Sequence, residues 1–536
     1  MKPMFKNLGC ALIVLGAGMG TAWSQTAGAR PPGASDADIE RVVQKTMNAF
    51  NVPGIAVGIV KDGKLVFAHG YGVREAGKPD KVDADTIFAI GSITKAFTTA
   101  ALGILVDEGK LGWDDRVIDH LPNFRLADPY VTREFTVRDL LTHRSGLGLG
   151  AGDLMIFPNS DFTRAEVVAG MRYLPFVTSF RSTFAYDNLL YIVAGELIPA
   201  ITGKSWEDFV EQRILNRVGM APCAVTRGRL KGTTDVASPH VVVDGKPRVV
   251  SAALSNAAAP AGSINCNVTN MAKWLTVQMA GGKLADGSTL FSPEQHAAMW
   301  KPETLIEVSP KSTELTRTHF RAYALGWGLE DFEGYQRVQH SGGVSGTVTH
   351  VSMLPELNLG VIVLTNQESG NALNAVTMHL LSAYALAGQK SRPKRDWVDF
   401  FKTLADQNEA QNRQIEAAAN AATTGSAGPA PLPLSTYVGT YNDPWRGDAT
   451  IRQEGDQLVL KFSRTTDLEG QLQHNGNGIF VVRWKDRSLY ADAYVRFSYN
   501  YDGSIAGMTM KAVSPRTDFS FDFHDLNFTK VKAPQH

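Results

Sequence analysis

Phe88-Ala-Ile-Gly-Ser92-Ile-Thr-Lys95-Ala-Phe97 is the stretch from which both the fold and the chemistry of this chain are inferred. It contains the pattern S-x-x-K. If a helix begins near Ser92, Lys95 lies one turn further on the same face, where its ammonium reaches the serine hydroxyl. The helix N-terminus favours negative charge on the serine oxygen. Ser92 is therefore a candidate nucleophile, and Lys95 is a candidate partner for its proton.

The same pattern also has a purely structural explanation. A serine that caps a helix, followed by a surface lysine, gives the same spacing. A second match, Ser391-Arg-Pro-Lys394, shows that the pattern arises by chance, and its internal proline makes it a poor site. The catalytic hypothesis therefore depends on further motifs elsewhere in the chain.

The second motif is Tyr186-Asp-Asn188, which follows a loop and precedes an apolar helix predicted over Leu189–Ile201. The proton of a tyrosine beside a lysine ammonium is more easily removed, so Tyr186 is a candidate general base. Asn188 offers both a donor and an acceptor, which suits it to hold Lys95 and a substrate amide. A core tyrosine beside a helix-capping Asp187 or Asn188 is the structural alternative.

The third motif is His340-Ser-Gly-Gly343, immediately before a predicted strand. The two glycines let the backbone approach a ligand closely, and a substrate along this edge takes main-chain hydrogen bonds. A backbone N–H here and that of Ser92 form a candidate oxyanion hole. His340, Ser341, Gly342 and Gly343 are therefore candidate substrate-binding residues. A glycine-rich turn with a surface histidine is the alternative.

Strand signals occur at both ends of the first ~390 residues, and the region between them is mostly helices and loops. The elements predicted at these two ends are a helix from the Ser35 cap to Phe50, strands over Ile55–Val60 and Lys64–Ala68 joined by an Asp62-Gly63 turn, strands over Val348–Leu354 and Gly360–Thr365, and a helix over Ser369–Ala387. The simplest packing is an α/β (α+β) domain over residues 36–390, in which helices flank one antiparallel sheet built from both ends.

The pattern changes after residue 390. A polar helix is predicted over Asp396–Ala422, and Thr423–Pro433 has the composition of a linker, so residues 391–433 are expected to join two domains. Short alternating strands with turn signals follow over residues 434–533, which predicts a small all-β barrel or sandwich. Its aromatic residues either line a pocket or, as is more usual at this spacing, form the core.

The first residues have the pattern of an export signal. Lys2 and Lys6 precede a short apolar stretch over 8–19, and small residues over 22–24 form a cleavage step. We expect residues 1–24 to be removed and the mature chain to be exported, periplasmic or secreted, without an integral membrane segment. A membrane anchor is the alternative, but the stretch is short for the roughly 20 residues that span a bilayer.

Composition excludes several other functions. Lys plus Arg and Asp plus Glu each number 53, so no net charge favours nucleic acid. His69, His143 and His350 have no metal-ligand spacing, and neither a metal nor a cofactor is predicted. The expected partner is a small-molecule or peptide substrate, and nothing in the sequence indicates the oligomeric state.

Cys223 and Cys266 either pair in the oxidising compartment or stay as two buried thiols.

Together the three motifs, in this order, resemble the serine β-lactamase and penicillin-binding-protein family, in particular its class C branch. The resemblance covers about residues 36–390, and the later β-region resembles the lipocalin-like C-terminal domain of some members. Supporting stretches are Asp139–Leu147, Ala259–Gly262, Tyr323–Trp327 and Val361–Asn366.

The resemblance implies a role for each motif. Ser92 is then acylated, Lys95 lowers its proton affinity, and Tyr186 acts as base toward Ser92 and as acid toward the leaving group. Asn188 orients the substrate and Lys95, and the N–H groups of Ser92 and Gly343 form the oxyanion hole. Water activated near Tyr186 completes deacylation.

The sequence departs from the family at His340, where penicillin-recognising members usually carry a lysine that binds the β-lactam carboxylate. Neutral histidine is a poorer anion partner. We therefore expect a serine hydrolase of the esterase or D-aminopeptidase type, acting on an ester or on a peptide or amide with small or D-configured residues. A β-lactamase or cell-wall D,D-carboxypeptidase is the alternative within the family. An acylated sensor protein with little turnover is the alternative from another class.

Overall fold

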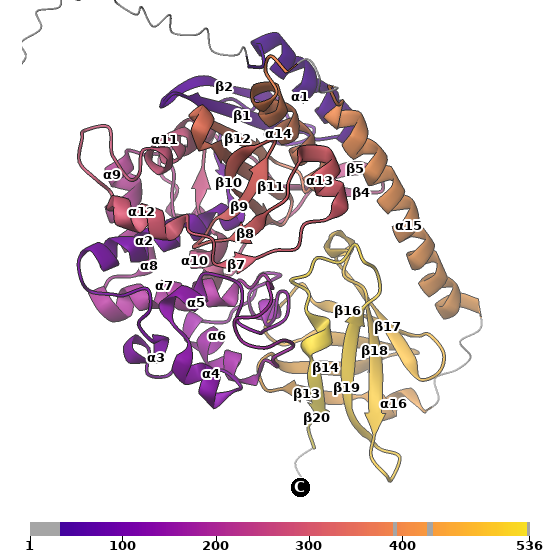
Figure 1. Cartoon of the computed structure of the whole chain (residues 1–536). Helices are drawn as coiled ribbons and strands as arrows, with labels where there is room; N and C mark the ends of the chain where they lie inside the picture. The colour runs from indigo at the N-terminus through magenta and orange to yellow at the C-terminus, as the bar shows by residue number, and fades with distance from the viewer. Residues whose placement is uncertain (1–32, 390–393, 426–431, 533–536) are drawn as a thin grey trace, which may run out of the picture.

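The computed structural model describes residues 33–389, 394–425 and 432–532, and its centre is one eight-stranded antiparallel sheet (Figure 1). Its strands, in spatial order, are β2 (Lys64–Gly72), β1 (Gly54–Lys61), β12 (Leu359–Thr365), β11 (Thr347–Leu354), β10 (Tyr335–Val344), β9 (Gly328–Phe332), β8 (Arg321–Tyr323) and β7 (Thr304–Leu305). The first strands of the chain thus pair with late ones, Ile55 opposite Thr365, as the strand signals at both ends predicted.

Both faces of the central strands are buried. Along β1, Ile55 and Val57 pack in one apolar cluster, while Ala56 and Val60 pack in the other, because successive side chains point to opposite faces. Helices α1 (Asp36–Phe50) and α14 (Gly370–Ala385) cover the first face, and α11 (Val268–Met279) covers the second. Helix α1 begins at the predicted cap, where the Ser35 side chain accepts from the Asp38 N–H.

A largely helical region fills the middle of the chain. Its longest helices are α2 (Thr94–Asp107) and α7 (Leu189–Thr202), and a short helix, α10 (Ala259–Gly262), packs against both. The shorter helices are α3 (Val117–His120), α4 (Pro129–Glu134), α5 (Val137–Leu140), α6 (Arg164–Gly170), α8 (Trp206–Val210), α9 (Asn216–Val218), α12 (Pro293–Met299) and α13 (Pro310–Thr316).

Two small strand pairs interrupt this helical region, and the sequence did not predict the second of them. Strands β3 (Phe88–Ala89) and β6 (Asn265–Cys266) pair just before Ser92, and β4 (His240–Val243) and β5 (Lys246–Val249) form a hairpin.

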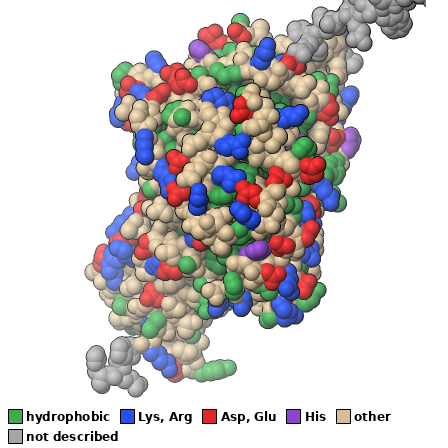
Figure 2. Space-filling model, turned by 90° about the vertical axis from the view of Figure 1, so that its left-hand side faces the viewer, with side chains coloured by type: hydrophobic (Ala, Val, Ile, Leu, Met, Phe, Trp, Pro, Cys, Tyr) green, Lys and Arg blue, Asp and Glu red, His purple; other side chains and the backbone are tan. Residues whose placement is uncertain are grey.

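The face shown in Figure 2 carries basic and acidic side chains intermingled, without a large patch of either sign.

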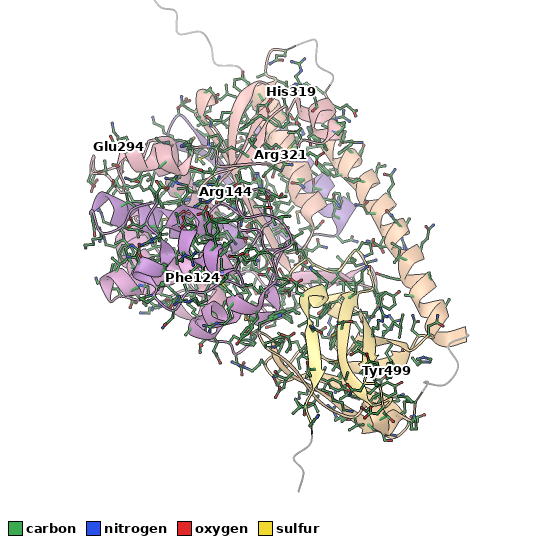
Figure 3. All side chains as sticks on the ribbon, turned by 60° about the horizontal axis from the view of Figure 1, so that its bottom comes forward. Phe124, Arg144, Glu294, His319, Arg321 and Tyr499 are labelled. Atoms are coloured by element: carbon green, nitrogen blue, oxygen red, sulfur yellow. A yellow bond between two sulfur atoms is a disulfide. The ribbon has the colours of Figure 1, made fainter. Side chains whose placement is uncertain are left out.

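The C-terminal region is a closed antiparallel barrel, which resolves the choice between barrel and sandwich. Its strands are β13 (Gly439–Asp443), β14 (Gly447–Glu454), β15 (Gln457–Phe462), β16 (Glu469–His474), β17 (Ile479–Trp484), β18 (Ala493–Tyr499), β19 (Ile505–Ala512) and β20 (Asn527–Lys530), preceded by α16 (Leu434–Tyr437). Tyr437, Tyr441, Trp445 and Trp484 are buried, so these aromatic rings form core rather than a binding pocket. Tyr499 marks the barrel in Figure 3, apart from Phe124 and Arg144 in the helical region.

A long helix, α15 (Trp397–Gly425), packs along α14 and leads toward the barrel (Figure 1). The predicted signal peptide, residues 1–24, and parts of the predicted linker, 391–393 and 426–431, lie outside the described residues. The domain limits 36–390 and 434–533 stay predictions. Within the described ranges, no helix is long and apolar enough to cross a membrane.

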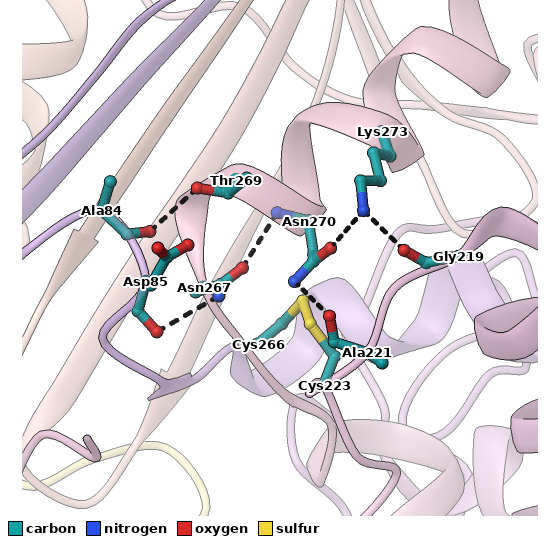
Figure 4. The surroundings of a disulfide bond; sticks show 10 residues. All are labelled: Ala84, Asp85, Gly219, Ala221, Cys223, Cys266, Asn267, Thr269, Asn270 and Lys273. Atoms are coloured by element: carbon teal, nitrogen blue, oxygen red, sulfur yellow. Dashed lines mark hydrogen bonds between the residues drawn. A yellow bond between two sulfur atoms is a disulfide. The ribbon is translucent and has the colours of Figure 1, made fainter. Parts of the chain in front are cut away.

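Cys223 and Cys266 form a disulfide, so the structure favours pairing over two free thiols (Figure 4). Cys266 ends β6, directly before α11. There the Asn270 amide donates to Ala221 O at 3.1 Å, and Lys273 donates to Gly219 O at 2.6 Å. These contacts hold the two chain segments together on either side of the bridge.

Replacing both cysteines with alanine is expected to lower the free energy of unfolding. A sequence separation of 43 residues corresponds to about 4 kcal/mol in the chain-entropy model. Urea unfolding followed by tryptophan fluorescence measures the change, and dithiothreitol should shift the midpoint of the parent chain but not of the double variant. An unchanged midpoint in both comparisons contradicts the expected stabilisation.

Candidate active site

A cleft of about 700 Å³ opens where β10, the helical region and the barrel meet. Seven of the eight predicted site residues line it: Ser92, Tyr186, Asn188, His340, Ser341, Gly342 and Gly343. The eighth, Lys95, is fully buried directly behind Ser92. Three stretches that are far apart in sequence therefore meet at one place.

Ser92 stands in a single 3₁₀ turn, Gly91–Ile93, that leads directly into α2. This turn packs against β10 so closely that side chains do not fit between them. A Cβ at Gly91, whose φ is +53°, falls 2.6 Å from Gly343 N, and a Cβ at Gly342 falls 1.9 Å from Ile90 O. The glycines thus bring the backbone around Ser92 against β10.

This packing changes the interpretation of the two β10 glycines. Gly342 was expected to let the backbone approach a ligand, but it faces the protein backbone at Ile90 instead. Gly343 has open space where its side chain would be, and it lines the cleft. Only Gly343 therefore leaves room for a substrate.

The Lys95 ammonium is held by three oxygens. Its Nζ lies 3.0 Å from Ser92 Oγ, 2.7 Å from Asn188 Oδ1 and 3.0 Å from Ala261 O. Three acceptors match the three N–H donors of an ammonium. Burial nevertheless lowers the pKa of Lys95 to about 7, and the carboxyl groups of Asp153 and Asp187 oppose that shift. Both protonation states are therefore accessible near neutral pH.

Tyr186 lies beside this pair. Lys95 Nζ is 4.8 Å from the centroid of the Tyr186 ring. Burial raises the pKa of the Tyr186 phenol well above its usual range, and its hydrogen bond with Ser92 opposes the rise. The phenol is accordingly protonated at neutral pH, the state in which it can donate a proton.

His340 is held as a neutral side chain. Its Nδ1 lies 2.6 Å from Ser341 O, a carbonyl that only accepts, so Nδ1 carries the proton. The Tyr323 hydroxyl donates to Nε2 at 2.8 Å. Burial and, after it, the nearby Lys95 lower the pKa of His340 to about 3. No cation stands at the first position of this motif.

Ser341 is oriented by a residue that the sequence did not point to. Arg337 donates to His350 Nε2 at 2.9 Å, so the proton of neutral His350 is on Nδ1. That Nδ1–H donates to Ser341 Oγ at 2.7 Å. The hydroxyl proton of Ser341 is thereby left to point into the cleft, where it serves as a donor to a substrate.

Asp153 and His143 are two further buried residues that motif reasoning missed. Asn188 Nδ2 donates to Asp153 Oδ2 at 2.7 Å, on the side of the amide opposite Lys95. The His143 ring packs 4.3 Å from the Tyr186 ring, and its Nδ1 accepts from the Asp187 N–H at 3.1 Å. His143 stands in a stretch already quoted for its resemblance, whereas Asp153 follows no recognisable pattern.

The antiparallel sheet with its helical region, and a serine at a helix start on the sheet edge, define the β-lactamase and transpeptidase class of fold. The family model described as Beta-lactamase matches residues 39–385, and the chain belongs to this family of serine β-lactamases, penicillin-binding proteins and related hydrolases. A second model, described as a domain of unknown function (DUF3471), matches residues 424–530.

Relatives extend the likeness across both regions. The unguisins hydrolase ungD' of Aspergillus campestris is 29% identical over 450 residues, 80% of each chain. The octameric penicillin-binding protein homologue from Pyrococcus abyssi superposes with a TM-score of 0.58 at 21% identity, covering 93% of this chain and 100% of that one. A class C β-lactamase from Rhodobacter sphaeroides, at 17% identity and a TM-score of 0.52, covers 64% of this chain and 98% of its own. At these identities the two structures show the fold.

Proposed function

We propose that the chain is a serine hydrolase that forms an acyl-enzyme on Ser92, and that its substrate is an ester or a peptide or amide with small or D-configured residues. One observation carries the proposal. The Lys95 amine lies 3.0 Å from the Ser92 hydroxyl in a buried site whose desolvation makes a neutral amine available near pH 7. A serine needs such a partner, because its hydroxyl is a weak nucleophile at neutral pH.

The geometry supports a balanced acylation step. Ser92 Oγ attacks the substrate carbonyl carbon while its proton passes to neutral Lys95. As the tetrahedral intermediate collapses, the Tyr186 phenol protonates the leaving group, and the Lys95 ammonium returns a proton to Tyr186. In deacylation, water attacks the carbonyl carbon of the acyl-enzyme and its proton passes to Lys95. As the bond between the acyl carbon and Ser92 Oγ breaks, Lys95 returns the proton to Ser92 Oγ, which restores the hydroxyl and the neutral amine. The net result is hydrolysis: the scissile bond is broken and one water molecule is added.

The oxyanion of each intermediate needs donors that are already in place. We assign these to the backbone N–H groups of Ser92 and Gly343, because the turn that carries Ser92 packs directly on Gly342 and Gly343. Donors fixed in the backbone stabilise the developing charge without reorganisation. The Ser341 hydroxyl, oriented by His350, is a further donor at the same wall of the cleft.

The charges in the cleft favour esters and peptides over β-lactams. Among the described residues that line it, only Arg321 is cationic, and Arg321 is paired with Glu330 at 3.2 Å. Two carboxylates, Glu368 and Asp518, line the same cleft. Burial raises the pKa of Glu368, and Asp518 raises it further. A substrate carboxylate therefore finds no free cation in the described cleft and meets two acidic groups.

We expect a chromogenic short-chain ester to be hydrolysed with a kcat/KM at least about tenfold above that of a chromogenic cephalosporin, since the cephalosporin carboxylate meets no free cation in the described cleft. D- and L-alanine anilides in the same assay measure the stereochemical preference. Faster cephalosporin turnover would point instead to the β-lactamase or D,D-carboxypeptidase alternative. A stable covalent adduct in intact-mass spectra, without product release, would point to a sensor.

A further inference from the structure

The segment that joins β19 to β20 leaves the barrel and contacts residues 39–385, which match the family model and are called the hydrolase region below. Phe519 on this segment lies edge-on to the Tyr186 ring, with ring centroids 5.9 Å apart. It also packs on Gly150, where an added Cβ would fall 2.8 Å from Phe519 O. The next residue, Ser520, is only 8% exposed. The barrel thus reaches the candidate active site itself.

This segment is hydrogen-bonded to the loop that carries Asp153. The Asp522 carboxylate accepts from the backbone N–H of Gly152 at 2.6 Å and from that of Leu154 at 3.1 Å. These are the two residues on either side of Asp153, so one barrel side chain fixes the backbone at that position. Asp522 and Asp153 are both fully buried, which leaves little room for water to replace these bonds.

A continuous path of hydrogen bonds then runs from the barrel to Lys95. Ser520 Oγ donates to Asp153 Oδ2 at 2.9 Å, and Asn188 Nδ2 donates to the same oxygen at 2.7 Å. No described residue bonds to the other oxygen, Asp153 Oδ1. Asn188 Oδ1 in turn accepts from Lys95 Nζ at 2.7 Å.

The orientation of the Asn188 amide depends on this path. Asp153 accepts only from the NH₂ side, which turns the amide oxygen toward Lys95. If the amide rotated by 180°, the N–H donors of the Asn188 NH₂ group would face the N–H donors of the Lys95 ammonium. Ser520 holds Asp153 Oδ2 in the position that prevents this rotation.

We propose that Ser520 of the barrel is a positioning residue for the hydrolase reaction, acting on Lys95 through Asp153 and Asn188, so that the barrel completes the active site. The inference rests on the proposed function, because it assumes that Lys95 takes part in catalysis. It assigns the barrel a role in the chemistry.

The path also couples the barrel to the charge on Lys95. The ionisable groups that face Lys95 are Asp153, Asp187, His143, His340, Tyr186 and Tyr191. Burial lowers the pKa of both histidines and raises that of both tyrosines, so these four groups are neutral near pH 7. Asp153 and Asp187 both raise the pKa of Lys95, and the carboxyl group of Asp522 interacts with Asp153.

The direction of the coupling follows from the hydrogen bonds. Burial, and after it the charge of Asp187, raises the pKa of Asp153 well above its usual range, and the hydrogen bonds from Asn188 and Ser520 oppose that rise. Ionised Asp153 in turn raises the pKa of Lys95. Without the hydroxyl, Asp153 binds its proton more tightly and loses charge. The pKa of Lys95 then falls, and neutral Lys95 is available at a lower pH.

The test is Ser520→Ala in the full chain, assayed with the short-chain ester from pH 5 to pH 9. We expect kcat on the plateau to fall by about 5- to 20-fold, with KM changed less than twofold. We also expect the acid limb of the kcat/KM profile to move to lower pH. Ser520→Thr, which keeps the hydroxyl, should restore most of kcat and return the limb toward its original position.

Ser514→Ala is the matched control. Ser514 belongs to the same barrel and is equally buried, but its hydroxyl donates to Glu416 on α15 at 2.9 Å, so kcat should stay at the parent value. Unchanged kcat in Ser520→Ala, or a lower kcat with the acid limb unmoved, would overturn the inference. The proposed function fails separately, through retained turnover in Ser92→Ala measured with the same ester.

Discussion

Replacing Ser92 with alanine is expected to lower kcat for the short-chain ester by at least about 10³-fold, in line with losses of other catalytic nucleophiles. The reason is that Ser92 Oγ is the proposed nucleophile, with Lys95 Nζ 3.0 Å away to take its proton. Alanine removes one oxygen from a partly buried side chain, so the variant should fold normally. The measurement is steady-state turnover together with thermal unfolding.

The chain supplies its own control for this experiment. Ser391 is the serine of the second S-x-x-K match, and Ser391→Ala should leave kcat unchanged. An ester adduct of a phosphonate probe should appear in intact-mass spectra of the parent chain and be absent from Ser92→Ala. Retained turnover or retained labelling in Ser92→Ala would remove the basis of the assigned mechanism.

Replacing Lys95 with methionine is expected to lower kcat by about 10²–10⁴-fold, the usual contribution of a general acid–base group. The apolar side chain fills a similar volume but leaves Asn188 Oδ1 and Ala261 O without their donor. Some loss of stability should accompany the loss of rate, because unpaired buried acceptors cost free energy. Lys394→Met, at the second S-x-x-K match, is the control and should change neither quantity.

The pH profile separates the chemical role of Lys95 from a structural one. Burial places the pKa of Lys95 at about 7, and only the neutral amine can accept the Ser92 proton. As the pH falls below 7, Lys95 becomes an ammonium and kcat/KM of the parent chain should fall with it. The residual rate of Lys95→Met should lack this limb. A limb that persists in the variant would assign it to another group.

Much of the fold follows from local signals that the sequence displays. The Ser35 cap and the Asp62-Gly63 turn each determine the backbone within a few residues. Alternation of apolar residues marked the paired strands at both ends of the hydrolase region, and β-rich spacing marked the barrel. The β4–β5 hairpin escaped prediction although Asp244-Gly245 is a turn signal, because its strands are only four residues long.

The motifs placed seven of the eight candidate residues in the cleft and Lys95 behind it, because each motif combines reactive side chains over a few positions. They did not determine protonation. The phenol of Tyr186 and the imidazole of His340 are neutral because both are buried, and burial depends on which distant segments cover them.

By itself the sequence determined the class of fold, the order of the two regions and the candidate nucleophile, since these depend on periodicity and on short motifs. Tertiary structure alone decided that Cys223 and Cys266 pair, that His350 orients Ser341, and that Ser520 contacts Asp153. The last contact joins residues 367 positions apart. Hydrogen bonds across such separations leave no local pattern, because they depend on how whole elements pack rather than on which residues are neighbours in the chain.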